Sequence, residues 1–207
     1  MATPPESPIE EEVVFELEHT RVPKPINVTI EDLYRETKFS KQEIRIMYRG
    51  FKTECPEGVV HEECFKEIYA KFFPHGNSSL YAHHVFRTFD INSTGSVNFR
   101  EFLNMLSTLL RGTMYDKVKW TFKLYDVNGD GRITRAEMSD LFHSIHELMG
   151  RKPHQTEEDR KAKEQLERTF RSFDPNNIGY INFEMWMKGL LTNRTIVNSF
   201  HVFHSDP

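Results

Sequence analysis

The sequence lacks several features that would place it in other protein classes. No apolar run approaches the roughly 18 residues that a membrane-spanning helix needs. The N-terminal stretch MATPPESPIEEEVV lacks the basic-then-apolar order of a secretory signal, and Ala2 stands where N-myristoylation requires glycine. The net charge of −4 gives no polybasic surface for nucleic acid. We therefore expect a cytoplasmic globular protein without a lipid anchor, which associates with the plasma membrane only through a partner.

The chain has only two cysteines, Cys55 and Cys64, and without a secretory signal we expect both to be reduced. His61 lies between them, which leaves zinc as an alternative, although tetrahedral zinc sites usually come as two close pairs of ligands. The sequence also contains no nucleophile–base motif, phosphate-binding loop or HExxH. We therefore do not expect an enzyme.

What the sequence does contain is an internal repeat. Each unit is an apolar helix, a twelve-residue loop with glycine sixth and an aliphatic residue eighth, and a second apolar helix. The helices show the 3.6-residue period, as in Phe99, Phe102 and Leu103. The predicted fold class is therefore all-α, with four helix–loop–helix units paired into two lobes. We number the loops 1 to 4 in chain order: residues 53–64, 90–101, 126–137 and 174–185.

Composition divides the chain further. Residues 1–28 are acidic and rich in proline, so we expect a disordered arm. Residues 29–111 hold the first pair of units and residues 112–192 the second. The tail, residues 193–207, has apolar residues at helical spacing, and we expect a helix that either packs on the second lobe or occupies a target groove. The charged stretch between the third and fourth units, GRKPHQTEEDRKAKEQ, predicts a long mobile connection.

Loop 3, DVNGDGRITRAE, has oxygen ligands at the spacing that calcium requires. Calcium takes six to eight hard oxygens, which a hand of this kind supplies from positions 1, 3, 5, 7, 9 and 12, with glycine at position 6 for the sharp turn. A chance match between two amphipathic helices is improbable, so we predict a calcium site rather than a solvated turn. The predicted ligands are Asp126, Asn128, Asp130, the carbonyl of Arg132, Thr134 through water, and bidentate Glu137.

Loop 2, DINSTGSVNFRE, keeps this frame but has a threonine at position 5. Because charge count tunes affinity, its two carboxylates against three in loop 3 predict weaker calcium binding, with Mg²⁺ as an alternative ion. The other interpretation is a loop that its partner holds folded without a metal. The predicted ligands are Asp90, Asn92, Thr94, Ser96, Asn98 and Glu101.

Loops 1 and 4 keep the frame without the ligands. Loop 1 has Cys64 at position 12, and Pro56 fixes a backbone angle that the wrap around a cation needs free. Loop 4 has Ile178 and Met185 where oxygens are needed, and a thioether is too soft for calcium. Both keep glycine sixth and an aliphatic residue eighth. We predict that they are structural partners, joined to loops 2 and 3 through short strands at the eighth positions.

A calcium sensor of this kind exposes an apolar groove into which an amphipathic helix of a target docks. Trp120 and Leu124 lie off the apolar stripe of their helix, so this helix has more apolar surface than one core face needs. The alternative is that these aromatic residues simply fill the core. The predicted groove residues are Phe72, Phe73, Tyr81, Phe86, Trp120, Phe122 and Tyr125.

Four phrases resemble the neuronal calcium sensor family, most closely its Kv channel-interacting branch: KFSKQEIRIMYRGFKTECPEG, FKEIYAKFFPHGN, LLRGTMYDKVKWTFKLYDVNGDG and IHELMGR. The similarity covers about residues 33–192. It implies a two-lobed calcium sensor that binds the cytoplasmic N-terminal segment of A-type voltage-gated potassium channels and alters their surface delivery and inactivation. In that branch loop 4 usually binds calcium, which Ile178 and Met185 argue against here. The alternative is a regulatory subunit of another target, such as a phosphatase or a membrane cyclase.

Overall fold

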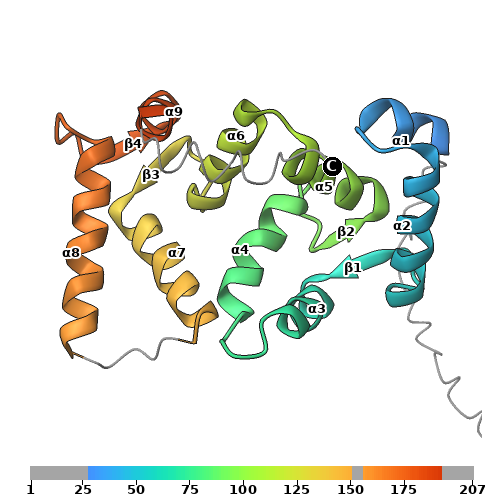
Figure 1. The fold of residues 1–207 in the computed structure, drawn as a ribbon, viewed down its shortest axis with the longest axis horizontal. Coiled ribbons are helices and arrows are strands. Elements are labelled where there is room, and N and C mark those ends of the chain that lie inside the picture. Colours follow the sequence, from blue (N-terminus) through green and yellow to red (C-terminus); the bar gives the residue numbers. More distant parts are fainter. Residues whose placement is uncertain (1–27, 151–155, 193–207) are drawn as a thin grey trace, which may run out of the picture.

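The structure is a computed structural model that describes residues 28–150 and 156–192. Within those ranges the chain forms nine helices and four strands of three residues each, which confirms the predicted all-α class (Figure 1). None of the described helices combines the length and the hydropathy needed to cross a bilayer. The predicted arm, apart from Val28, and the predicted tail helix lie outside the described residues.

The two halves of the chain repeat one order of elements. The first half contains α1 (Ile30–Glu36), α2 (Lys41–Glu54), β1 (Val59–His61), α3 (Glu62–Phe72), α4 (Ser79–Phe89), β2 (Ser96–Asn98) and α5 (Phe99–Arg111). The second half contains α6 (Met114–Tyr125), β3 (Arg132–Thr134), α7 (Arg135–Leu148), α8 (Thr156–Phe173), β4 (Tyr180–Asn182) and α9 (Phe183–Thr192). Each strand is part of one loop and leads directly into the following helix.

The strands join the loops in pairs, as predicted. β1 pairs antiparallel with β2, with Val60 opposite Val97, and β3 pairs antiparallel with β4, with Ile133 opposite Ile181. These four residues are the eighth positions of the loops, and all four are buried. A strand this short is not stable alone, so each loop depends on its partner for its backbone conformation.

Each half has its own apolar core, and a third core is shared. Leu33, Ile44 and Leu103 belong to the core of the first half, and Ile133 and Phe170 to that of the second. The shared core consists of Val85, Phe86, Phe89, Val97 and Met105 from the first half with Leu124 and Leu141 from the second. Helix α4 lies at the middle of the molecule and packs on both α6 and α7 (Figure 1). The two halves are therefore joined by buried apolar contacts.

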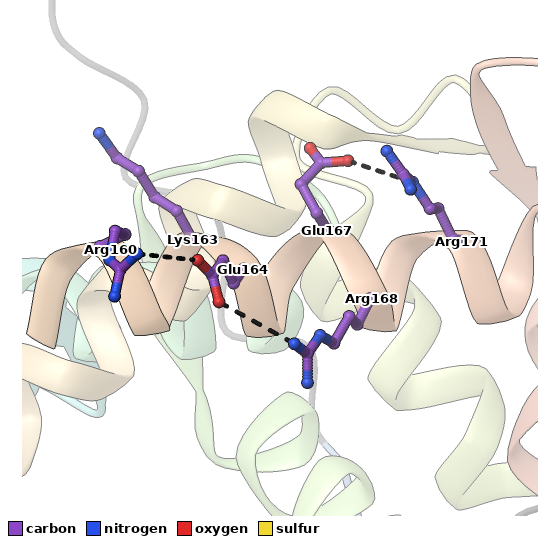
Figure 2. A pocket seen from close by; sticks show the side chains of 6 residues that line it. All are labelled: Arg160, Lys163, Glu164, Glu167, Arg168 and Arg171. Atoms are coloured by element: carbon purple, nitrogen blue, oxygen red, sulfur yellow. Dashed lines mark ion pairs between the residues drawn. The ribbon is translucent and has the colours of Figure 1, made fainter.

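The prediction of a mobile connection between the third and fourth units was wrong for most of its length, because α8 begins at Thr156. One side of this helix is anchored by Phe170 and Phe173, which are buried in the core of the second half. The opposite side is exposed and carries ion pairs at helical spacing, such as Arg160 and Arg168 with Glu164 (Figure 2). Such pairs support a helix that is polar over most of its surface.

Candidate metal centre and target-binding surface

Loop 3 is wound around the side chain of Asp126, its first residue. One carboxylate oxygen of Asp126 accepts a hydrogen bond from the backbone N–H of Asp130 at 3.1 Å, and the other accepts from that of Gly131 at 3.0 Å. Gly131 has a positive φ of 80°, a conformation that costs glycine little. The carboxylate of Asp126 thus faces the inside of the turn and is only 7% exposed.

Glu137 closes the same loop from its other end. Its Oε1 accepts from the backbone N–H groups of Val127 at 3.1 Å and Asn128 at 3.3 Å, across the full length of the loop. Its Oε2 accepts from the backbone and the hydroxyl of Thr134, at 2.9 and 2.8 Å. Thr134 and Glu137 also form the capping box that starts α7. The Glu137 carboxylate therefore links the start of loop 3 to the first turn of α7.

Loop 2 has the same arrangement. Asp90 accepts from the backbone N–H groups of Thr94 at 2.9 Å and Gly95 at 2.8 Å. Glu101 accepts from the side-chain amide of Asn92 at 2.6 Å and from the backbone of Asn98 at 3.0 Å. Asp90 and Glu101 are each 8% exposed. The third and last predicted ligands of loop 2, Asn92 and Glu101, are therefore in contact, and the carboxylate of Asp90, the first, faces the inside of the turn.

Other predicted ligands point elsewhere in this structure. The hydroxyl of Thr94 donates to the carbonyl of Ser96 at 2.9 Å, and the side chain of Asn98 caps α5. In loop 3, Asp130 is exposed and accepts from the backbone of Arg132 at 2.9 Å and from the side chain of Asn128 at 3.2 Å. The Arg132 guanidinium lies over the ring of Tyr180, which leaves its backbone carbonyl as the predicted ligand.

The donor set of both loops fits a hard divalent cation. In the described part of the chain, no three His, Cys, Asp or Glu side chains gather closely enough to hold a metal by themselves. Loops of this type do not need such a cluster, because amide, carbonyl and water oxygens complete the shell around few carboxylates. Loops 2 and 3 each offer two buried carboxylates that face the turn, and loop 3 adds Asp130 at its rim. Loop 3 therefore offers the higher charge.

Loop 4 keeps the hydrogen bonds of loop 3 but has a different last residue. Asp174 accepts from the backbone N–H groups of Ile178 at 2.9 Å and Gly179 at 2.8 Å, which repeats the bonds of Asp126. Met185, in place of the closing glutamate, packs against the core of the second half. In loop 4 the first position therefore maintains the turn, and the twelfth contributes to the core.

In loop 1, too, residues at ligand positions contribute to the apolar core. Cys55 is buried in the core of the first half, Cys64 packs against the same core, and the hydroxyl of Thr53 donates back to Arg49 of its own helix at 2.9 Å. Burial, with a smaller effect of the neighbouring Cys64, raises the pKa of the Cys55 thiol. His61 is exposed and 3.9 Å from Glu57. The structure therefore does not gather the zinc site that was the alternative for these residues.

The predicted groove is mostly not an exposed surface. Phe86 and Phe122 are buried, and Tyr81, Trp120 and Tyr125 pack against the cores. Burial raises the pKa of Tyr125 to about 12. The physical reason is that α6 has two apolar faces: Val118 and Phe122 face the core of the second half, whereas Leu124 faces α4 in the shared core. The additional apolar surface of α6 thus joins the two halves.

Phe72 and Phe73, the other two predicted groove residues, do lie at the surface. Phe72 is 73% exposed. Both line a hollow of about 250 Å³ between the end of α3 and the end of α7, together with Pro74, His75, Leu148 and Met149. Leu148 and Met149 were not among the predicted groove residues, because their place in the hollow depends on how the halves meet.

The turn after α3 is fixed against α7 at this hollow. The backbone and side-chain amides of Asn77 donate to the carbonyl and the carboxylate of Glu147, both at 2.9 Å. A Cβ on Gly76 would lie 1.9 Å from the carbonyl oxygen of Leu148, so only glycine fits there. The hollow is thus built from both halves at a close backbone contact.

A second hollow, of about 370 Å³, lies along the exposed side of α8. Figure 2 shows that its lining side chains all come from this one helix: Arg160, Lys163, Glu164, Glu167, Arg168 and Arg171. The ion pairs among them are 3.9–4.0 Å long and exposed, a kind that contributes little. This surface is a solvated helix face.

The two halves define a protein built from paired helix–loop–helix hands, with the loops of each pair joined by a short two-stranded sheet. Residues 56–109 and residues 115–184 each match a family model described as an EF-hand domain pair. Each range lies within one half and includes the two strands that pair its loops. The chain is an EF-hand calcium-binding protein.

Proposed function

We propose that this protein is a calcium sensor in which loop 3, and more weakly loop 2, binds the ion. The observation that carries the proposal is the pair of buried carboxylates at the two ends of each loop. From the far end, Glu137 reaches back to the start of loop 3 at Val127, and Glu101 reaches back to Asn92 in loop 2. A bound calcium ion would supply the charge that holds these carboxylates together. Loops 1 and 4 keep their partners in register, and Mg²⁺ competes at loop 2.

Helix α7 connects the calcium loop to the exposed hollow. Its first turn contains Glu137, and its last turn leads to Leu148 and Met149, which line the hollow with Phe72 and Phe73. A helix moves nearly as a rigid body, so a shift of the Glu137 carboxylate is carried to the hollow. We propose that opening of this hollow provides the apolar surface for a target helix.

The target we propose is an amphipathic helix in a cytoplasmic segment of an A-type voltage-gated potassium channel. The resemblance of the sequence to the Kv channel-interacting branch supports this choice, and the hollow supplies an apolar anchor site of the kind a helix needs. The second candidate is regulation of another target, such as a phosphatase or a membrane cyclase. Both candidates use the same surface.

The test is a titration of a fluorescent peptide from such a channel N-terminus, with calcium and with chelator. We expect binding that depends on calcium and that Phe72→Asp weakens by at least about tenfold, since the charge would enter an apolar contact. Ile178→Asp is the matched control, because Ile178 is also an exposed apolar residue but belongs to loop 4. Equal loss in both variants, or binding unaffected by calcium, would contradict the proposal.

A further inference from the structure

Arg87, near the end of α4, holds the C-terminal end of α6 and the start of loop 3. Its guanidinium donates to the carbonyl oxygens of Lys123 at 3.2 Å, Leu124 at 3.1 Å and Asp126 at 3.0 Å, and also to that of Val127. The last carbonyls of a helix have no partner within the helix and carry the negative end of its dipole. A residue of the first half thus satisfies the end of a helix in the second.

The reverse contact is also present. Lys123 of α6 donates through Nζ to the carbonyl of Thr88 at 3.0 Å, and the indole N–H of Trp120 donates to the hydroxyl of Thr88 at 2.9 Å. Thr88 is fully buried and lies two residues before Asp90, the first residue of loop 2. Each of the two helices that lead into a predicted calcium loop is therefore capped by a cation from the other.

We propose that Arg87 and Lys123 form a reciprocal brace that transmits the filling of loop 3 to α4 and so to loop 2. Asp126 and Val127, whose carbonyls Arg87 holds, are positions 1 and 2 of loop 3. Closure of the loop around an ion moves these carbonyls, and the guanidinium fork ties that movement to α4. Arg87 is a positioning residue, and this role rests on the proposed binding of calcium at loop 3.

The hydrogen bonds of the brace lie partly out of solvent. Arg87 is half-buried, and Lys123 is exposed overall although its Nζ reaches the Thr88 carbonyl; desolvation lowers the pKa of both side chains. The carboxylates of Asp126 and Glu137 act in the opposite direction on the pKa of Arg87, so its charge interacts with the ligands of loop 3. A carbonyl left without Arg87 would be an unsatisfied polar group in a partly buried place, which is costly. Its four carbonyl partners therefore favour the position that Arg87 has here.

The test uses the full chain with Glu101→Gln, so that only loop 3 fills. Hydrogen–deuterium exchange of residues 79–89 is compared with and without calcium, and calorimetry confirms that loop 3 is filled in each variant. We expect calcium to change the exchange rate of α4 by at least about fivefold, in line with ordinary coupling between sites. With Arg87→Gln this response should disappear while loop 3 still binds calcium.

Two further variants separate charge from geometry. Arg87→Lys keeps the charge but cannot satisfy several carbonyls in a fixed fork, so it should restore only a small part of the response. Arg45→Gln, which removes an exposed arginine of α2, should leave the full response. An equal response with and without Arg87, or no response in either protein, would overturn the brace and leave the proposed function standing. A loop 3 that takes up no calcium would overturn both.

Discussion

Asp174 is the residue whose replacement best separates a structural role from a metal-binding one. Although loop 4 lacks ligands, Asp174 is 3% exposed and its carboxylate accepts two short backbone hydrogen bonds, from Ile178 and Gly179. Hydrogen bonds to charged groups contribute about 1.5–3 kcal/mol each, and their loss leaves two N–H groups without a partner. We expect Asp174→Ala to lower the free energy of unfolding by about 3–6 kcal/mol.

The assay is urea denaturation in the presence of a chelator, followed by tryptophan fluorescence, in Trp120→Phe protein so that Trp186 is the emitter. Trp186 stacks on Phe173, next to Asp174, with ring centroids 4.8 Å apart, so it reports on this part of the core. Asp174→Asn keeps one acceptor and should lose about half as much stability. Glu184→Gln, at an exposed residue of the same loop, is the control and should change little. A loss below about 0.5 kcal/mol for Asp174→Ala would refute the structural role.

Two other predictions follow from the structure. Met185→Glu supplies the residue type of a closing ligand but places a carboxylate against the core of the second half, so we expect lower stability, by about 2 kcal/mol, and no added calcium site in calorimetry. An extra bound ion would contradict this. Burial lowers the pKa of His84 from its ordinary value of 6.5, so the folded state binds fewer protons than the unfolded state. The contribution of His84 to stability without calcium should be fully present above about pH 6.5 and be lost as the pH falls below that value, so His84→Gln should reduce the loss of stability at low pH. An unchanged pH profile in the variant would show that another group is responsible.

The sequence was sufficient for the features that depend on local spacing. The positions of the loops, the pairing of Val60 with Val97 and of Ile133 with Ile181, and the helical class all follow from a repeat of fixed length. Such a repeat constrains both ligand geometry and strand register, because a shift by one residue would turn the eighth side chain out of the core.

Features that depend on how the halves meet could not be predicted in this way. The apolar surplus on α6 was assigned to an open groove, because periodicity shows that a face is apolar but not what covers it. The structure places Leu124 against α4. The contacts of Arg87 were missed for the same reason, since a lone arginine on an amphipathic helix gives no signal of a distant helix end. The length of α8 was missed because a polar sequence was taken for a linker.

The most direct test of the account is calorimetric titration of the full chain with calcium, alongside Glu137→Gln and Glu101→Gln. We predict two ions bound by the wild type, loss of the tighter one in Glu137→Gln and loss of the weaker one in Glu101→Gln, because each substitution removes one of the two buried carboxylates of its loop. Binding that survives Glu137→Gln unchanged, or a wild-type protein that takes up no calcium at micromolar concentration, would contradict it.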